Sequence, residues 1–241
     1  MKRALVSGGS GEIGAAICRA LAAGGWEVIV HARAHPDRAV ALAEEITAAG
    51  GQAQSACFDV VDPAATSSAL AVLLQAGPIQ GVVHNAGIHD DVTMAGMSAR
   101  QWHDVIGVSL HGFFNLVQPL LLPMLRTRWG RIVALSSISG VTGNRGQTNY
   151  AAAKAGMDGA MRSLSLEVAS RGVTVNSVAP GIIDTAMSAG AFDATRIGQL
   201  VPMKRAGTAA EVAGLVGYLM SEGAGYITGQ VISINGGMAS T

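Results

Sequence analysis

The segment Ala4-Leu5-Val6-Ser7-Gly8-Gly9-Ser10-Gly11-Glu12-Ile13-Gly14 decides the fold of this chain. Its apolar beginning predicts a buried strand, and the glycines that follow allow a tight turn into a helix. Residues 9–14 match the pattern G-x-G-x-x-G, in which the backbone approaches a pyrophosphate at the N-terminus of the next helix. An ordinary strand-to-helix turn is the alternative, but the position directly after the first strand favours nucleotide binding.

Apolar runs and alanine-rich amphipathic stretches alternate through the rest of the chain. This alternation predicts an α/β fold with a parallel sheet covered by helices on both faces. No linker, repeat or low-complexity segment is visible, so we expect one domain over residues 1–241. Thr208-Ala209-Ala210-Glu211 predicts a capping box at the start of the last long helix. Strands are expected near residues 3–7, 26–31, 52–57, 79–84, 130–136, 173–178 and 230–234. Helices are expected near residues 12–23, 36–49, 63–75, 99–126, 149–170, 188–200 and 209–220.

The composition argues against several classes of partner. Hydrophobic residues make up 49% of the 241 residues, which is enough for a sizeable core. The 16 basic and 16 acidic residues balance, so nothing favours a nucleic-acid or anionic-membrane partner. No set of His, Cys, Asp and Glu has metal-ligand spacing. We therefore expect no metal, no nucleic acid and no membrane.

The cysteines and the apolar segments indicate a soluble cytoplasmic protein. Cys18 and Cys57 fit a reduced compartment and are expected to be free thiols. No signal peptide is expected, because the first residues run directly into a strand. The most apolar helix, around residues 116–125, is interrupted by Pro119 and Pro123, and we expect it to be too short to span a bilayer of about 30 Å.

The end of the second strand predicts the cofactor. An acidic residue about 20 residues beyond the glycines would hold the ribose hydroxyls of NAD. Ala32 stands there, and Arg33 can meet a 2′-phosphate, so we infer NADPH or NADP⁺. A solvated surface charge is the alternative for Arg33. Asp59 and Val60, after the third strand, are expected near the adenine, and Asn85-Ala86-Gly87 is expected to form a tight turn beside the cofactor.

Tyr150 and Lys154 carry the strongest chemical signal. Positions i and i+4 of a helix share one face, so the phenol and the ammonium point into the same space. A free tyrosine has a pKa of about 10, and a nearby cation lowers it towards neutrality, where the phenol can exchange a proton. Ser137, at the end of the strand 130–136, can hold a substrate oxygen beside that phenol. A surface pair is the alternative for Tyr150 and Lys154.

Together these motifs resemble the short-chain dehydrogenase/reductase family over the whole chain. The glycine loop, residues 85–87, Ser137, Tyr150, Lys154 and Pro180-Gly181 follow the family's order and spacing. The resemblance implies a doubly wound, seven-stranded Rossmann fold. Within the family the chain is similar to the 3-oxoacyl-[acyl-carrier-protein] reductases. That similarity is carried by residues 143–156, 167–176 and 226–230, and residues 87–91 are more weakly similar to the reductases of aryl-polyene pathways.

The resemblance assigns roles to these residues. Tyr150 gives a proton to the carbonyl oxygen as hydride arrives, Ser137 hydrogen-bonds that oxygen, and Lys154 binds the nicotinamide ribose and lowers the pKa of the tyrosine. Two donors aimed at an oxygen that gains negative charge would stabilise it. Ile183 and Thr185 are expected to contact the carboxamide. The expected cofactor-binding residues are Gly8, Ser10, Gly11, Glu12, Ile13, Gly14, Arg33, Asp59, Val60, Asn85, Ala86, Gly87, Tyr150, Lys154, Pro180, Gly181, Ile183 and Thr185.

Three positions depart from the family pattern. Ser109 stands where the family has a catalytic asparagine that helps to hold a water of the proton relay, and we count Ser109 among the catalytic residues. Glu12 replaces the middle glycine, and its carboxylate is expected to turn outward, where it favours the helix dipole. His84 replaces a common asparagine and is expected to be a packed strand-end histidine rather than a base.

The resemblance also implies partners. Arg128 and Arg171 match basic positions that dock the acidic carrier protein, with exposed arginines of no special role as the equal alternative. Small residues on helices 99–126 and 149–170 allow close helix pairing, and related reductases assemble this way, so we predict a homotetramer with dihedral symmetry. Methionines and Phe192 around residues 187–203 predict either a substrate lid near 186–205 or ordinary packing.

The leading functional hypothesis is NADPH-dependent reduction of a carrier-bound 3-oxoacyl thioester to the 3-hydroxyacyl thioester. An NADP-dependent alcohol, sugar or acyl-CoA dehydrogenase of the same family is a second hypothesis. A nucleotide-binding protein with little catalysis is a third, suggested by Ser109 and Glu12. The intact set of Ser137, Tyr150 and Lys154 argues against it.

Overall fold

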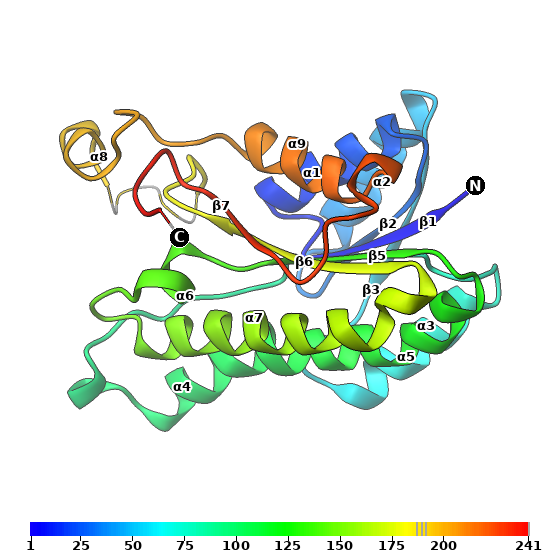
Figure 1. Ribbon diagram of the computed structural model, residues 1–241, viewed down its shortest axis with the longest axis horizontal. Helices are drawn as coiled ribbons and strands as arrows, with labels where there is room; N and C mark the ends of the chain where they lie inside the picture. The colour runs from blue at the N-terminus through cyan, green and yellow to red at the C-terminus, as the bar shows by residue number, and fades with distance from the viewer. Residues whose placement is uncertain (187, 189, 191, 241) are drawn as a thin grey trace.

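The computed structural model describes residues 1–186, 188, 190 and 192–240, and it contains a seven-stranded sheet in the order β3-β2-β1-β4-β5-β6-β7 (Figure 1). All neighbouring strands pair in parallel, which confirms the predicted sheet. Each predicted strand is present, and where a predicted end differs from the observed one, the difference is one or two residues. The strands are β1 (Arg3–Ser7), β2 (Glu27–Ala32), β3 (Gln52–Cys57), β4 (Gly81–His84), β5 (Gly130–Leu135), β6 (Val173–Pro180) and β7 (Val231–Ile234).

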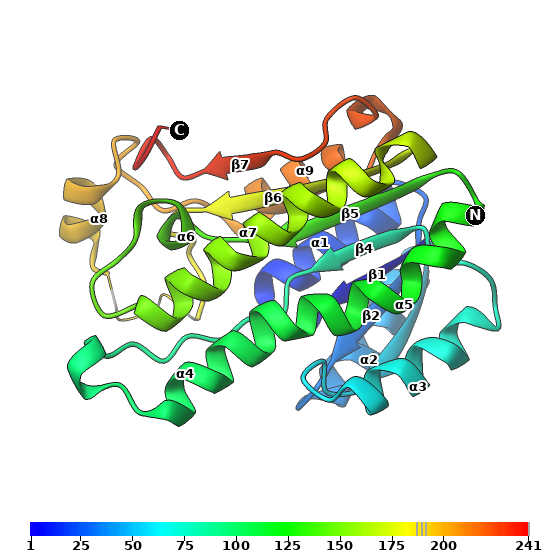
Figure 2. The same cartoon turned by 60° about the horizontal axis from the view of Figure 1, so that its bottom comes forward.

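Helices cover both faces of the sheet and enclose two hydrophobic clusters (Figures 1 and 2). One face carries α1 (Glu12–Ala23), α2 (Pro36–Ala48) and α9 (Ala209–Leu219). The other carries α3 (Pro63–Leu74), α4 (Ala99–Ile106), α5 (Gly112–Arg126) and α7 (Thr148–Val168). The inner strands alternate their side chains between the two clusters, so that Leu5 joins one and Val6 the other. The shorter helices are α6 (Ile138–Thr142), α8 (Ala194–Leu200) and the 3₁₀ turns η1 (Met94–Gly96), η3 (Ala169–Arg171) and η4 (Glu222–Ala224).

Local hydrogen bonds explain where the helices begin and end. The predicted capping box is confirmed, because Thr208 Oγ1 accepts from Glu211 N and the Glu211 carboxylate accepts from Thr208 N. Helix α8 begins at Ala194, six residues later than predicted, since the side chain of Asp193 caps it by accepting from Arg196 N at 2.7 Å. Of the expected lid 186–205, residues 187, 189 and 191 lie outside the described residues.

The long helix expected over 99–126 is not a regular α-helix. A π-helical turn, η2 (Gly107–His111), separates α4 from α5, and the amide of Gly112 bonds to Gly107 O, five residues earlier. The turn therefore widens the helix at the position of Ser109. Such single π turns inside α-helices occur frequently at functional sites.

The length of this helical stretch corrects one expectation. Ala99–Arg126 forms 28 residues with a mean hydropathy of 1.6 over its most apolar window, so by length and composition it is long enough to cross a membrane. Half of that window is buried inside the protein, as in the core helix of a globular domain. Pro119 and Pro123 lie within α5 without ending it.

Both cysteines are free thiols, Cys18 buried and Cys57 exposed, as predicted.

Candidate active site

The predicted site residues meet at one edge of the sheet. Parallel strands all end on the same side, and Figure 2 shows their arrowheads pointing towards α6 and α8. The glycine loop follows β1, Asn85 follows β4, Ser137 follows β5 and Gly181 follows β6. The strand order reverses between β1 and β4, and a ligand binds at such a crevice in open α/β sheets.

The glycine loop fits a pyrophosphate. Gly8 has a φ of +62°, which favours glycine. A Cβ on Gly14 would lie 2.2 Å from Gly8 O, so only glycine lets α1 approach the loop this closely. Gly11 caps α1 without a side-chain hydrogen bond. The first-turn amides, which a helix cannot pair internally, therefore remain available to an anion. Ser10 and Ile13 lie within the same turn.

Side chains from three strands hold this loop in place. Asn85 Nδ2 donates to Gly8 O at 3.0 Å. His31, near the end of β2, accepts from Gly8 N at 3.2 Å through Nδ1. The hydroxyl of Ser7 accepts from the amides of Asn85 and Ala86. Sequence reasoning missed Ser7 and His31 as supports of the site, although a polar residue at the end of a buried strand is a usable signal.

The carboxylate of Glu12 does not face the loop. Its oxygens accept from Ala186 N at 3.0 and 3.2 Å, and the side chain is exposed. It has turned away from the first-turn amides, and it links the start of α1 to the segment after β6. Any contact of residue 12 with a cofactor would therefore run through its backbone.

The residues expected around the adenosine end lie together. Arg33 Nη1 forms an exposed ion pair with Asp59 Oδ2 at 3.6 Å, and Ala32 is buried. The Cys57 thiol donates to Arg33 O. Val60 is buried, and its carbonyl accepts from Asn115 Nδ2 at 2.9 Å. The guanidinium of Arg33 is therefore exposed just beyond the end of β2, beside the carboxylate of Asp59.

The segment after β6 contributes the remaining predicted residues. Pro180 ends β6, and a Cβ on Gly181 would lie 2.8 Å from Asn235 Cα, so this close approach requires glycine. Ile183 is buried and pairs with Gly207 in an isolated parallel bridge. Thr185 is half-buried one residue before Ala186.

Ser137, Tyr150 and Lys154 come together at the end of β5. Ser137 caps α6 by accepting from Ser139 N at 3.1 Å. Tyr150 and Lys154 lie one turn apart on α7, with the Lys154 ammonium 5.5 Å from the centroid of the tyrosine ring. Lys154 is only 3% exposed, and its Nζ donates to Leu135 O at 2.7 Å.

The electrostatics of this group correct one expectation. Burial raises the pKa of Tyr150 above its ordinary value, and the adjacent Ser137 hydroxyl offsets only part of this. The pKa of Tyr150 is therefore raised and not lowered as expected, because burial dominates. Burial also lowers the pKa of Lys154 itself to about 8, against an opposing effect of Asp158. A buried ammonium is disfavoured, and so it is a weaker source of positive charge.

Ser109 lies in the π turn, close to Lys154. Its hydroxyl is fully buried and has no hydrogen-bond partner among the residues that the structure describes. A Cβ on Gly87 would lie 3.8 Å from Ser109 Oγ and 3.2 Å from Lys154 Nζ. The missing side chain of Gly87 therefore leaves a narrow space that the hydroxyl and the ammonium share.

Sequence reasoning missed two acidic residues near the site. Asp158, one turn beyond Lys154, is buried and accepts from Ser136 Oγ at 2.7 Å, and burial raises its pKa. Asp91 accepts from Gln147 Nε2 at 2.7 Å, and its charge adds to the raised pKa of Tyr150. The i, i+4 spacing from Lys154 could have identified Asp158.

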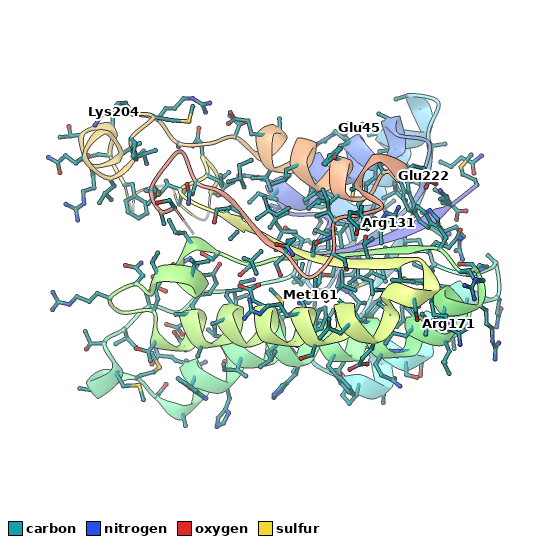
Figure 3. The ribbon with its side chains drawn as sticks, viewed as in Figure 1. Glu45, Arg131, Met161, Arg171, Lys204 and Glu222 are labelled. Carbon is teal, nitrogen blue, oxygen red and sulfur yellow. The ribbon has the colours of Figure 1, made fainter. Side chains whose placement is uncertain are left out.

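Arg128 and Arg171 lie at the opposite edge of the sheet. They precede β5 and β6, and a Cβ on Gly172 would lie 2.4 Å from Arg128 O, so the two arginines are neighbours. Figure 3 shows Arg171 far from Lys204, which follows α8. The structure does not bring these arginines together with Tyr150.

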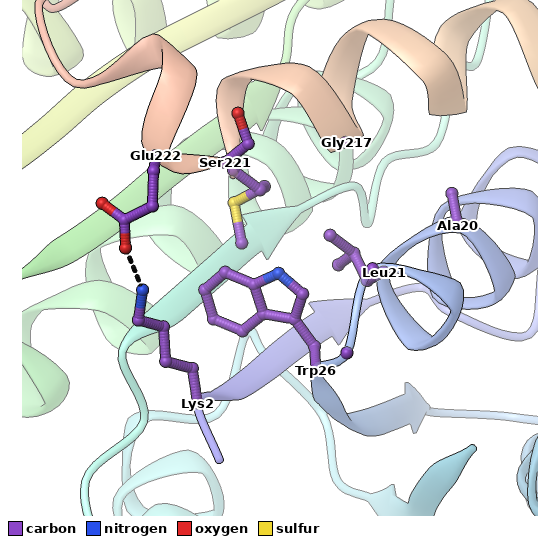
Figure 4. Close-up of a pocket in the computed structure, with 10 residues that line it drawn as sticks. Lys2, Ala20, Leu21, Trp26, Gly217, Ser221 and Glu222 are labelled. Carbon is purple, nitrogen blue, oxygen red and sulfur yellow. Dashed lines mark hydrogen bonds and ion pairs between the residues drawn. The ribbon is translucent and has the colours of Figure 1, made fainter. Parts of the chain in front are cut away.

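One surface pocket also lies away from the predicted site. It has a volume of about 430 Å³ and is bordered by Trp26 and by the ion pair of Lys2 with Glu222, at the amino edge of the sheet (Figure 4). Within the described ranges no group of three or more His, Cys, Asp or Glu residues is arranged to hold a metal ion.

Comparisons with known proteins agree with this geometry. A family model described as enoyl-(acyl carrier protein) reductase matches residues 9–239. The chain is 41% identical over 236 residues to the 3-oxoacyl-[acyl-carrier-protein] reductase of Aggregatibacter actinomycetemcomitans, covering 97% of this chain and 98% of the relative. It is 42% identical over 240 residues to nodulation protein G of Azospirillum brasilense, with 98% of both chains covered. It is equally identical to the 3-oxoacyl-[acyl-carrier-protein] reductase of Escherichia coli strain K12, with 98% and 97% covered. The chain therefore belongs to the short-chain dehydrogenase/reductase family of oxidoreductases and is similar to its 3-oxoacyl-[acyl-carrier-protein] reductases.

Proposed function

We propose that this protein reduces a 3-oxoacyl thioester, carried on an acyl carrier protein, to the 3-hydroxyacyl thioester with NADPH. The observation that carries the proposal is the meeting of Ser137, Tyr150 and Lys154 at the sheet edge that also bears the glycine loop. The named relatives support the substrate class, since two of them are 3-oxoacyl-[acyl-carrier-protein] reductases.

In this proposal the side chains stabilise and protonate the substrate oxygen. NADPH, when bound, supplies the hydride to the carbonyl carbon. Ser137 donates a hydrogen bond to the oxygen, and Tyr150 transfers its phenolic proton to it as negative charge develops. The raised pKa of Tyr150 keeps the phenol protonated, and therefore ready to donate, at neutral pH. Lys154 binds the nicotinamide ribose and returns a proton to the tyrosine.

The choice of NADPH rests on the end of β2. The buried Ala32 leaves no carboxylate where a ribose 2′-hydroxyl would be bound, and the exposed Arg33 offers a guanidinium for a 2′-phosphate. The cradle of Gly8 and Gly14 and the uncapped N-terminus of α1 suit the pyrophosphate.

The docking of a carrier constrains the assembly. Helix α7, with 21 residues, is about 30 Å long and separates Tyr150 from Arg171. A carrier docked at Arg128 and Arg171 would therefore lie at the far end of its own subunit. Exposed apolar side chains on α5 and α7, among them Phe114, Leu122 and Leu166, suit burial in a subunit interface. We propose a cytoplasmic homotetramer in which neighbouring subunits bring docking surface and active site together.

The decisive experiment is NADPH oxidation with acetoacetyl and longer 3-oxoacyl thioesters, each on carrier protein and on coenzyme A. We expect turnover of the carrier thioesters and loss of the preference for the carrier in an Arg128→Ala/Arg171→Ala variant. A crotonyl thioester tests the enoyl reduction named by the family model, and simple secondary alcohols with NADP⁺ test the dehydrogenase alternative. Tight NADPH binding without turnover of any substrate would favour a nucleotide-binding protein.

A further inference from the structure

His84 connects the glycine loop to the helix that carries Ser109. It ends β4 and is completely buried. Its Nδ1 lies 3.1 Å from Ser7 Oγ, and its Nε2 lies 2.9 Å from the carbonyl oxygen of Ser109. One imidazole therefore spans the gap between β1 and the π turn.

The hydrogen bonds fix which nitrogen of His84 carries the proton. The Ser7 hydroxyl already accepts from two amides, those of Asn85 and Ala86, which uses both of its lone pairs. Its proton must then go to His84 Nδ1. The second ring nitrogen, Nε2, consequently carries the hydrogen and donates it to Ser109 O.

The acceptor of this bond lies where the helix is widened. In the π turn Gly107–His111 the backbone bonds run five residues back, as from Gly112 N to Gly107 O. His84 reaches the Ser109 carbonyl from outside this helix, and a Cβ on Gly112 would lie only 3.4 Å from His84 Cε1. The imidazole is thus packed directly against the turn.

We propose that His84 is a positioning residue for the proton relay, because its Nε2–H holds the π turn and so directs the buried Ser109 hydroxyl to the space beside Gly87 and Lys154. The Ser109 hydroxyl has no partner in the described part of the chain, and this space is where a relay water would bridge it to the ammonium. The expected effects of His84 on turnover rest on the proposed function.

A role for His84 as acid or base is excluded by the same contacts. Both ring nitrogens are engaged with Ser7 and Ser109, and neither faces the substrate side. Burial, with the nearby charge of Lys154, lowers the pKa of His84 to about 3, so the ring stays neutral at working pH. The ring of Phe113 also contacts it edge-on, with the two ring centroids 6.0 Å apart.

His84 and Ser109 both depart from the family pattern, and the hydrogen bond between them connects the two departures. The family commonly has asparagine at position 84 and asparagine at position 109. Here a longer side chain at 84 reaches the turn, and a shorter one stands at 109. The longer side chain at 84 thus holds the turn that carries the shorter side chain at 109.

The experiment compares two amides of different length. The longer amide side chain in His84→Gln can place a donor near the position of Nε2, whereas the side chain in His84→Asn is too short to reach Ser109 O. We expect His84→Gln to keep most of the wild-type kcat and His84→Asn to lose roughly tenfold or more, as for other displaced catalytic groups. The dissociation constant of NADPH should stay within about twofold of wild type in both. The double variant His84→Asn/Ser109→Asn should regain activity.

Two outcomes would overturn the proposal: equal losses in His84→Gln and His84→Asn, or a double variant whose loss is the product of the single losses. A readout independent of the substrate separates this from failure of the proposed function. Hydrogen exchange of the amides of residues 107–112 should accelerate in His84→Asn and not in His84→Gln or Ser109→Ala. Unchanged exchange in His84→Asn would overturn the proposal even if no thioester proves to be a substrate.

Discussion

The ammonium of Lys154 donates to the carbonyl oxygen of Leu135, 2.7 Å away, and not to a charged side chain. A buried lysine whose hydrogen bond goes to a neutral carbonyl is costly to keep charged, and burial lowers its pKa to about 8 despite the nearby charge of Asp158. Lys154 therefore titrates close to neutral pH, and the charge of the candidate active site changes with it.

The first prediction concerns Tyr150. Tyr150→Phe keeps the aromatic ring but removes the proton donor. We expect turnover of the 3-oxoacyl thioester to fall by at least about 100-fold, the usual contribution of a positioned acid. NADPH binding, followed by fluorescence titration, should be retained. Near-normal turnover in this variant would show that another group donates the proton.

The second prediction concerns the stability of Lys154 variants against pH. The ordinary pKa of 10.5 applies to the unfolded chain, so between pH 8 and 10.5 the unfolded state binds more protons than the folded state. Stability from this residue therefore rises with pH through that window. Below pH 8 the buried charge costs about 3 kcal/mol at the usual value per pKa unit.

Lys154→Met should accordingly be more stable than wild type at pH 7, and the difference should shrink as the pH rises from 8 to 10. Urea unfolding of both proteins across this range measures the effect. The raised pKa of Tyr150 acts on both proteins and cancels in the comparison. A difference independent of pH would contradict the burial of a charged lysine.

The third prediction concerns the cofactor. Arg33→Ala should raise the KM for NADPH at least about tenfold while changing that for NADH little, because only NADPH carries the phosphate that a guanidinium can clamp. Asp59→Asn is the matched control, since it frees Arg33 from its ion pair and leaves the guanidinium in place. Equal changes for the two nucleotides in Arg33→Ala would rule out Arg33 as the phosphate-binding residue.

The fourth prediction concerns Glu12. Glu12→Gln retains an oxygen that can accept from Ala186 N but removes the negative charge at the N-terminus of α1. NADPH binding should tighten by about two- to fivefold, because the repulsion of a pyrophosphate is relieved, and the gain should shrink at high salt. Isothermal titration of both proteins at two ionic strengths tests this. Weaker binding in Glu12→Gln would mean that the carboxylate supports the site.

The fifth prediction concerns assembly. Leu166 is 85% exposed on α7, and an apolar surface of this kind is stabilised by burial between subunits. Leu166→Glu should dissociate the tetramer into smaller species, measured by light scattering at micromolar concentration. Val72→Glu changes another exposed apolar residue, on α3, and should leave the assembly intact. A monomeric wild type would refute the predicted tetramer.

Much of the fold could be predicted because it depends on local pattern. The buried runs that form β1 and β5 are continuous and apolar, and the glycine loop leaves few alternatives to a strand-turn-helix. The start of α8 was missed because the capping by Asp193 outweighs the apolar pattern before it.

The candidate site could be predicted less completely, because its chemistry depends on contacts between distant parts of the chain. The π turn at Ser109 is supported by His84, 25 residues away, and no local pattern indicates it. The pKa of Tyr150 is raised because burial dominates, and the depth of burial becomes known only once the fold is complete.

The bond between Glu12 and Ala186 joins positions 174 residues apart in sequence. It links the start of α1 to the segment after β6. A pyrophosphate at the start of α1 would repel the carboxylate and weaken its bond to the Ala186 amide, so this segment would respond to the nucleotide. Such coupling is reciprocal by thermodynamic necessity, and a substrate that orders the neighbourhood of Ala186 must change the affinity for the nucleotide by the same factor. In this chain such coupling would run through the glutamate that stands in place of the family's glycine.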